Sequence, residues 1–249
     1  MCLLAMFFRV LEDAPLIVGA NRDELYSRPG EPPQILDGPL PAVAGLDPVA
    51  RGTWFGVNQR GVFVAVTNRP KSELSSKLRS RGLLVRDLLG CRTATQAVDQ
   101  AVRELGQGCY AGCNLMCADQ DNAMVIHAGD WLRIRPLPPG LHGLTSHDVN
   151  DASDRRLGHA LWWLSQRSYR SAKECLQALE KLCSQSGNGG PAICQRGDQS
   201  GTVSSSLLAL RSPLAQSSYW HAQGPPDRTP YQDYSPVLRH LFASSSDRE

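Results

Sequence analysis

The order of apolar segments along this chain is the feature that most limits its possible folds. Strand-like segments come first, followed in turn by a helix pair, further strands, a second helix pair and late strands. Short turns such as Glu12–Pro15 and Gly129–Asp130 join consecutive strands. Hairpins that outnumber crossovers favour antiparallel sheets with helices on their outer faces. We therefore predict an α+β fold in a single domain over residues 1–243, with a polar, disordered tail at 244–249.

Periodicity locates the individual elements. Apolar residues at helical spacing, bounded by capping residues and glycines, predict helices over 81–89, 93–106, 154–165 and from 171 to Gly187, with a short one starting at Ser235. Strands are predicted over 2–10, 16–20, 54–58, 62–67, 112–118, 123–128, 131–135, 202–210 and 217–223. Six prolines in residues 28–50 predict a loop there, with an edge strand as an alternative.

Charge and hydropathy exclude several classes of protein. Lys and Arg number 26 against 24 Asp and Glu, so no strongly basic surface is available for nucleic acid. The apolar runs are shorter than the ~18 residues of a membrane helix. The run Leu3–Phe8 is also short of the ~7–15 residues of a signal-peptide core. We expect a cytoplasmic protein without a transmembrane segment; the oligomeric state is not indicated.

The chain has eight cysteines. Three of them, Cys109, Cys113 and Cys117, are spaced four apart, but paired C-x-x-C motifs and clustered histidines are missing from the sequence. In an extended strand Cys113 and Cys117 would face the same side, toward a core. We predict structural thiols, no metal site and no cofactor.

Cys2 is the first candidate for chemistry. Removal of Met1 is efficient when the second residue is small, and it would leave a free cysteine at the N-terminus. The thiol and the α-amine, with reference pKa values of ~8.5 and ~7.7–8.0, would then form a nucleophile and its base on one residue. The alternative is that Cys2 is only a small apolar residue of the first strand.

The second candidate is the polar run Asn21–Glu24, which directly follows the apolar strand 16–20. A hairpin centred near residues 12–14 would bring this run beside the start of the first strand and place Asp23 opposite Cys2. A helix-capping or surface cluster is the alternative.

A third candidate follows another apolar strand, at Asn68–Arg69. A side-chain amide at a strand end can donate to an oxyanion, although asparagine before a turn is also ordinary turn chemistry. Asn114 is a further amide in an apolar strand. Competing motifs, Gly-x-Ser-x-Gly and His-Glu-x-x-His, do not occur in the sequence.

These features come together in a family resemblance. Met1–Cys2, Gly19–Glu24 and Tyr26–Pro29 resemble the NRDE family of transport and Golgi organisation 2-like proteins. That family in turn resembles N-terminal-nucleophile hydrolases of the choloylglycine hydrolase and penicillin V acylase type. Further matching stretches are 52–58, 66–69, 80–82, 112–115 and 201–206.

The resemblance implies a four-layer αββα sandwich and a set of site residues. Cys2 would be the nucleophile, Asp23 would position its amine, Asn68 would stabilise the oxyanion, and Arg22 would lower the thiol pKa. Substrate binding is expected at Asn21, Asn114 and Trp54.

Two functions follow as hypotheses. The first is an N-terminal-cysteine amidohydrolase acting on a small-molecule or acyl amide bond, without a cofactor. The alternative is a non-catalytic binding or trafficking protein for an apolar ligand such as an acyl lipid or haem. The sequence does not indicate which substrate is used.

Overall fold

A computed structural model describes residues 2–187 and 190–246, and the chain forms two compact units. The first unit comprises residues 1–29 and 139–239, and the second comprises 30–138 and 240–249. Residues 30–138 are therefore inserted between the two stretches that build the first unit. The single domain over residues 1–243 stays a prediction.

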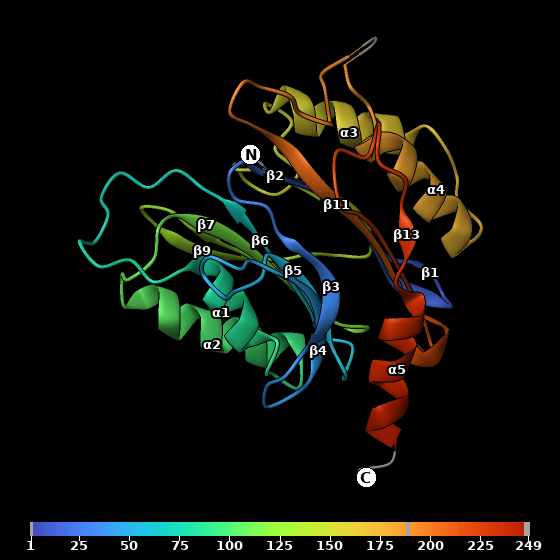
Figure 1. The fold of residues 1–249 in the computed structure, drawn as a ribbon, viewed down its shortest axis with the longest axis horizontal. Coiled ribbons are helices and arrows are strands. Elements are labelled where there is room, and N and C mark those ends of the chain that lie inside the picture. The colour runs from blue at the N-terminus through green and yellow to red at the C-terminus, as the bar shows by residue number, and fades with distance from the viewer. Residues whose placement is uncertain (1, 188–189, 247–249) are drawn as a thin grey trace. The chain divides into compact units, whose positions relative to one another are not determined.

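The first unit is built on a six-stranded antiparallel sheet, in the order β10-β1-β2-β11-β12-β13. Helices α3 (Arg155–Ser165) and α4 (Ala172–Cys183) cover one face of this sheet (Figure 1). A short 3-10 helix, Leu214–Gln216, precedes β12. The strands are β1 (Leu3–Leu11), β2 (Ala14–Leu25), β10 (Gly140–Leu144), β11 (Ser200–Leu210), β12 (Ser218–Ala222) and β13 (Gln232–Asp233).

Alternation along the strands decides which side chains face the helices. Leu3, Ala5 and Phe7 of β1 belong to the core that α3 and α4 close. Helix α4 approaches β2 closely at Gly19, where a Cβ atom would lie 2.9 Å from the Cβ of Leu179. The intervening residues of β1, such as Leu4, are buried on the opposite face. Both faces of this strand therefore carry apolar side chains.

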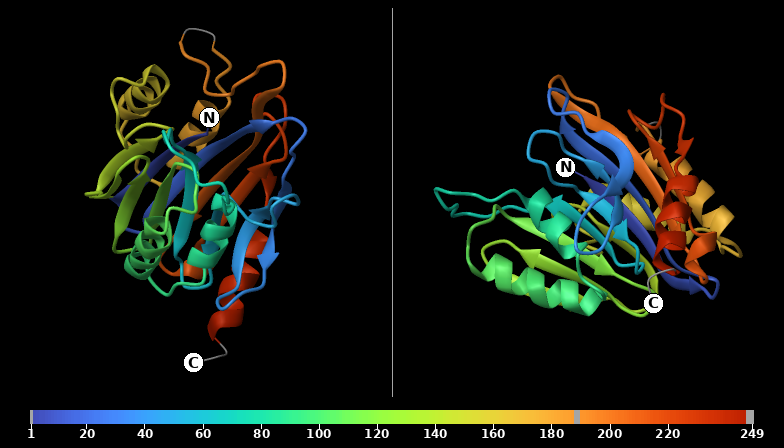
Figure 2. Two further views of the ribbon diagram at one scale, coloured as in Figure 1. Left: turned by 90° about the vertical axis from the view of Figure 1, so that its left-hand side faces the viewer. Right: turned by 60° about the horizontal axis from the view of Figure 1, so that its bottom comes forward.

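The second unit has a seven-stranded antiparallel sheet in the order β3-β4-β5-β6-β7-β8-β9. Helices α1 (Arg81–Leu88) and α2 (Ala94–Gly106) lie on one face of it (Figure 2). Cys113 and Cys117 both lie in the core under these helices, which confirms their predicted common side. The strands are β3 (Glu31–Leu36), β4 (Ala42–Leu46), β5 (Phe55–Asn58), β6 (Phe63–Asn68), β7 (Cys113–Ala118), β8 (Ala123–Ala128) and β9 (Leu132–Pro136).

Helix α5 (Ser235–Ser246) begins where the sequence predicts it. It continues through residues 244–246, where the sequence predicts a disordered tail, because the buried Leu241 and Phe242 anchor its later turns. Residues 247–249 of that tail lie outside the described residues. Within the described part of the chain, no helix is long and apolar enough to cross a membrane.

Residues 28–50 are predicted as a loop with an edge strand as the alternative, and no strand is predicted in residues 136–152; both segments contain strands. Residues 28–50 hold β3 and β4: Pro32 and Pro33 sit in β3, an edge strand, where a missing backbone N–H is tolerated. In residues 136–152, β10 pairs with β1. Its five residues are too short to show a periodicity, and its partner lies far away in the sequence.

The β1–β2 hairpin differs from the predicted register by one residue. Leu3 pairs with Asn21, whereas the expected register would pair Leu4 with it. The shift arises at a β-bulge, where Arg9, with a φ of 49°, and Val10 lie opposite Pro15 alone. Pro15 has no N–H to donate to the ladder, so the pairing is interrupted there.

Candidate functional site

Cys2 lies just before β1, at the end of an inner strand of the first unit's sheet. It is partly exposed, and its thiol donates to the backbone carbonyl of Asp23 at 3.9 Å. Burial of the sulfur, followed by the negative charge of Asp23, raises the pKa of the Cys2 thiol above its ordinary value. Arg22 lowers the thiol pKa, as predicted, but burial outweighs its effect. A thiol in this environment needs a base to become a nucleophile.

The carboxylate of Asp23 is held from two sides. Its Oδ2 accepts from Nη1 of Arg156 at 2.8 Å, and its Oδ1 accepts from Oγ1 of Thr202 at 2.6 Å. Arg156 lies in the first turn of α3, and Nη2 of its guanidinium also donates to the carbonyl of Ile193 at 2.5 Å. The side chains of Asp23 and Arg156 are 3% and 14% exposed. A largely buried ion pair therefore fixes this carboxylate on the helix-facing side of the sheet.

Thr202 connects this carboxylate to the loop before β11. It lies directly opposite Asp23 in the strand pairing. Its hydroxyl oxygen accepts from the backbone N–H of Gln195 at 2.8 Å, which directs the hydroxyl proton to Asp23. The carboxylate orientation is thus set by a short chain of hydrogen bonds.

Arg22 occupies the other face of β2. Its guanidinium donates to the carbonyl of Arg28 at 3.2 Å and lies 3.6 Å from a carboxylate oxygen of Glu24. The side-chain alternation of β1 places Cys2 on this same face, opposite the face of Leu3. Ser204 pairs with Arg22 in β11, and its buried hydroxyl has no hydrogen-bond partner among the described residues. A thiol, a cation and a hydroxyl therefore share one end of this sheet face.

Asn21 faces the helices instead. Its Nδ2 donates to the carbonyls of Cys183 and Ile193 at 2.9 and 3.1 Å, so the amide ties β2 to the end of α4. This placement separates the amide of Asn21 from the face that carries Arg22.

The remaining candidates lie in the second unit. Asn68 ends β6 and is exposed. Trp54 is half-buried just before β5, and its ring lies against Gly45 of β4, where a Cβ atom would be 2.8 Å from the indole. The structure thus places both residues at strand ends of the same sheet.

Asn114 belongs to a row of buried polar side chains across the sheet. Thr67, Asn114 and His127 occupy directly paired positions on β6, β7 and β8. Nδ2 of Asn114 donates to Oγ1 of Thr67 at 3.3 Å, and its Oδ1 lies 2.8 Å from Nδ1 of His127. Because buried polar groups are costly unless they are bonded, a row of this kind in an apolar sheet marks a candidate site.

Sequence reasoning did not find Arg156, Thr202 or His127 as site residues. Arg156 follows the helix N-cap Asp154 and resembles an ordinary surface residue of a helix start. Thr202 lies in the stretch 201–206, which matches the family, so the sequence does contain a signal there. His127 had a weaker signal, a histidine within an apolar strand.

Comparison with known proteins gives one family and several relatives. The family model described as Transport and Golgi organisation 2 matches residues 1–212. The Transport and Golgi organization protein 2 homolog of Homo sapiens is 33% identical over 139 residues, covering 53% of this chain and 50% of that protein. The homolog of Mus musculus is 32% identical with the same coverage. The chain thus spans about half the length of the curated relatives it matches.

Solved structures are similar over nearly the whole chain. Penicillin V acylase from Agrobacterium tumefaciens has a TM-score of 0.54 at 12% identity and covers 95% of this chain and 88% of its own. A Caenorhabditis elegans ortholog of N-acylethanolamine-hydrolyzing acid amidase has a TM-score of 0.58 at 15% identity, covering 96% and 97%. At these identities the likeness concerns the fold. The predicted α+β fold class of N-terminal-nucleophile hydrolases is confirmed.

Proposed function

The chain belongs to the Transport and Golgi organisation 2 family, and we propose that it is an amidohydrolase with Cys2 as its nucleophile. The proposal depends on one observation, that the Cys2 thiol lies beside Asp23 at one end of the sheet. The carboxylate of Asp23 is held there by Arg156 and Thr202. The names of the structural neighbours, an acylase and an amidase, support hydrolysis of an amide bond. We expect the enzyme to act in the cytoplasm on a small-molecule or acyl amide.

The proposal requires a base for a thiol whose pKa burial has raised. Removal of Met1, which lies outside the described residues, would give Cys2 a free α-amine. This amine takes the thiol proton, and the carboxylate of Asp23 holds the resulting ammonium in place. The rigid attachment of that carboxylate to α3 and β11 supports this positioning role.

The reaction then follows the usual course of acyl transfer. The Cys2 thiolate attacks the amide carbon, and the carbonyl oxygen becomes an oxyanion, to which we assign the Asn68 amide as donor. The ammonium returns its proton to the amide nitrogen, the C–N bond breaks and the amine leaves. Water then hydrolyses the thioester, which releases the acid and restores the thiol. We assign substrate contacts to Asn114 and Trp54, and to Asn21 the support of the end of β2.

Amide hydrolysis can be tested on the full chain with acyl amides of different chain length, by detecting the released amine. Mass spectrometry of the same preparation reports whether Met1 is present. We expect Cys2→Ala to lower kcat/KM by about 10³-fold or more, because the nucleophile is removed. Cys109→Ala is the matched control, since Cys109 is the other partly exposed cysteine of the described chain.

Two results would end the proposal. One is full turnover by the Cys2→Ala protein, and the other is an active preparation in which every chain still begins with Met1. In the second case the α-amine of Cys2 is part of a peptide bond and cannot take a proton.

The family's name, which refers to transport and Golgi organisation, supports a second proposal, binding of an apolar ligand such as an acyl lipid or haem without catalysis. Native mass spectrometry of protein purified from cells tests it. A ligand that is retained equally by the chain and by Cys2→Ala would favour binding, and a protein without any retained ligand would count against it.

A further inference from the structure

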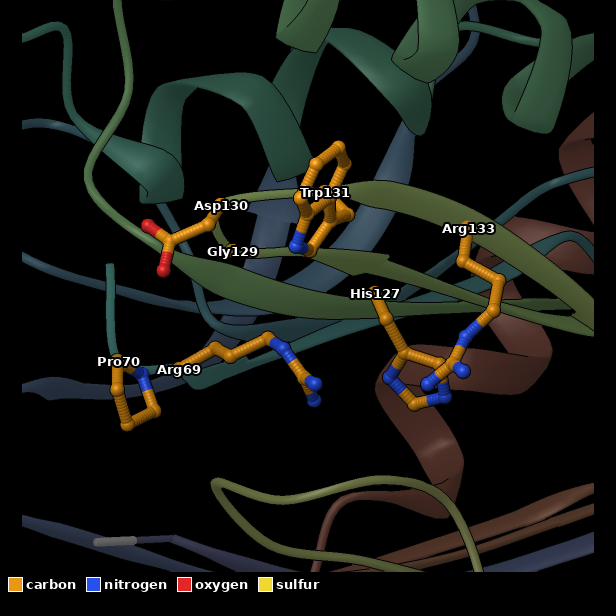
Figure 3. Close-up of a pocket in the computed structure, with 7 residues that line it drawn as sticks. All are labelled: Arg69, Pro70, His127, Gly129, Asp130, Trp131 and Arg133. Atoms are coloured by element: carbon orange, nitrogen blue, oxygen red, sulfur yellow. The ribbon is translucent and has the colours of Figure 1, made fainter. Parts of the chain in front are cut away.

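The second unit contains a pocket that the proposed catalytic residues do not line. Its volume is about 250 Å³, and its cationic and aromatic side chains come from the end of β6 and from the β8–β9 hairpin. Arg69, His127, Arg133 and Trp131 line it, together with Gly129 and Asp130 (Figure 3). Arg69 and Arg133 bring two guanidinium groups to this small space, with the imidazole of His127 beside them.

The pocket is continuous with the buried polar row. Oδ1 of Asn114 accepts from Nη1 of Arg69 at 3.2 Å and lies 2.8 Å from Nδ1 of His127. Nδ2 of Asn114 donates to Thr67, so the amide atom that faces His127 is the oxygen Oδ1. Nδ1 of His127 is therefore the donor in this hydrogen bond. One buried amide thus fixes a guanidinium and an imidazole.

The position of Arg69 is also fixed by the backbone. A Cβ atom at Gly129 would lie 3.1 Å from Nε of Arg69 and 3.0 Å from the carbonyl oxygen of Pro70. The absence of a side chain at Gly129 lets the arginine lie along the hairpin. Figure 3 shows its guanidinium extending toward His127 and Arg133.

Among the described residues that line the pocket, the carboxylate of Asp130 is directed elsewhere. Both oxygens of Asp130 accept from Ser72, from the backbone N–H at 2.7 Å and from the hydroxyl at 2.8 Å. In Figure 3 this carboxylate lies at the opposite end of the pocket from Arg133. Among the described lining residues, Arg69 and Arg133 therefore lie with His127 away from the Asp130 carboxylate.

We propose that this pocket binds the oxyanion group, a carboxylate or a phosphate, of a small organic molecule. Guanidinium groups present paired N–H donors that match the oxygens of both anions. Arg133 is paired with His127 across β8 and β9, so both side chains rise from one side of the sheet toward the anion. Trp131, which is 85% exposed beside the pocket, contacts the organic part of the ligand with its indole ring. This binding does not depend on the proposed hydrolysis.

Calorimetric titration of the full chain with phenyl phosphate, phenylacetate and phenol tests the proposal. We expect both anions to bind and phenol not to, with the tighter anion identifying the preferred group. Arg133→Gln should weaken anion binding by about tenfold or more, because a charge-assisted contact is lost. Gly129→Ala should weaken it through displacement of Arg69, and Trp131→Ala should weaken phenyl phosphate more than inorganic phosphate.

The matched control is Arg135→Gln. Arg135 lies on the same strand and the same face, two residues farther along, and does not line the pocket. Equal losses in Arg133→Gln and Arg135→Gln would indicate general surface charge and would overturn the proposal, as would failure of a folded chain to bind either anion at millimolar concentration. The Cys2→Ala protein should bind the anions normally even if it hydrolyses nothing, so failure of the two proposals can be distinguished.

Discussion

The ion pair between Asp23 and Arg156 allows a quantitative prediction. Replacing Arg156 by glutamine leaves a carboxylate that is 3% exposed without its cation and also removes the hydrogen bond to Ile193. Loss of one partner of a buried ion pair typically costs ~3–5 kcal/mol. The Thr202 hydroxyl still donates to Asp23, and Arg156 is 14% exposed, so we expect the lower end, about 3 kcal/mol.

Urea denaturation followed by circular dichroism measures this loss, and thermal unfolding should show a decrease in Tm of about 6–12 °C. Arg155→Gln provides the control, because Arg155 is the exposed neighbour in the same helical turn. Its effect should stay within about 0.5 kcal/mol. The double variant with Asp23→Asn should lose about 2 kcal/mol less than the sum of the single variants, since the two side chains contact each other directly.

The reasoning would be refuted by additivity in that cycle, or by an Arg156→Gln protein as stable as Arg155→Gln. Either result would mean that Asp23 is solvated or re-paired when the guanidinium is removed. The proposed positioning role of Asp23 would then lose its structural support.

Three further predictions concern stability. Burial lowers the pKa of the His221 imidazole to about 4, below its ordinary value of 6.5, so its stabilising contribution is complete above pH ~6.5 and is lost as the pH falls toward 4. Urea titrations between these pH values should therefore show a smaller loss of stability in His221→Gln. Its free energy of unfolding should fall by about 3 kcal/mol less than that of the unchanged chain. Thr93→Ala should cost ~1 kcal/mol in urea unfolding, because Thr93 caps α2, whereas Thr95→Ala inside the helix should not destabilise. Gly19→Ala should lower the free energy of unfolding by ~1–3 kcal/mol, since the new methyl group would collide with Leu179; an unchanged urea midpoint would refute this.

Much of the fold could be predicted because its signals are local. The helix caps at Thr93 and Ser171, and the hairpin turn at Gly129–Asp130, are written within a few residues of sequence and occur where expected. Strands β4 and β10 were missed for the opposite reason. Each has five residues and owes its existence to a neighbouring strand rather than to its own pattern.

The candidate site was predictable in part. Counting across the hairpin brought the run Asn21–Glu24 near Cys2, and the structure places the Asp23 carbonyl 3.9 Å from that sulfur. The partners that hold the Asp23 carboxylate were not predictable, because Arg156 and Thr202 are 133 and 179 residues away in the chain. Only the folded structure brings such distant side chains together.

The bulge in β1 determines which side chains of the run Asn21–Glu24 lie on each face of the sheet. In the regular hairpin that the sequence suggests, Asp23 would share the face of Cys2, and Arg22 would turn toward the helices. The extra residue opposite Pro15 reverses this assignment, so that Asp23 meets Arg156 of α3 while Arg22 stays on the face of Cys2. A one-residue shift in register therefore decides whether the Asp23 carboxylate contacts the guanidinium of Arg156 or faces the thiol of Cys2. Any catalytic coupling between Cys2 and Asp23 must pass around the end of the strand, where the thiol already reaches the Asp23 backbone.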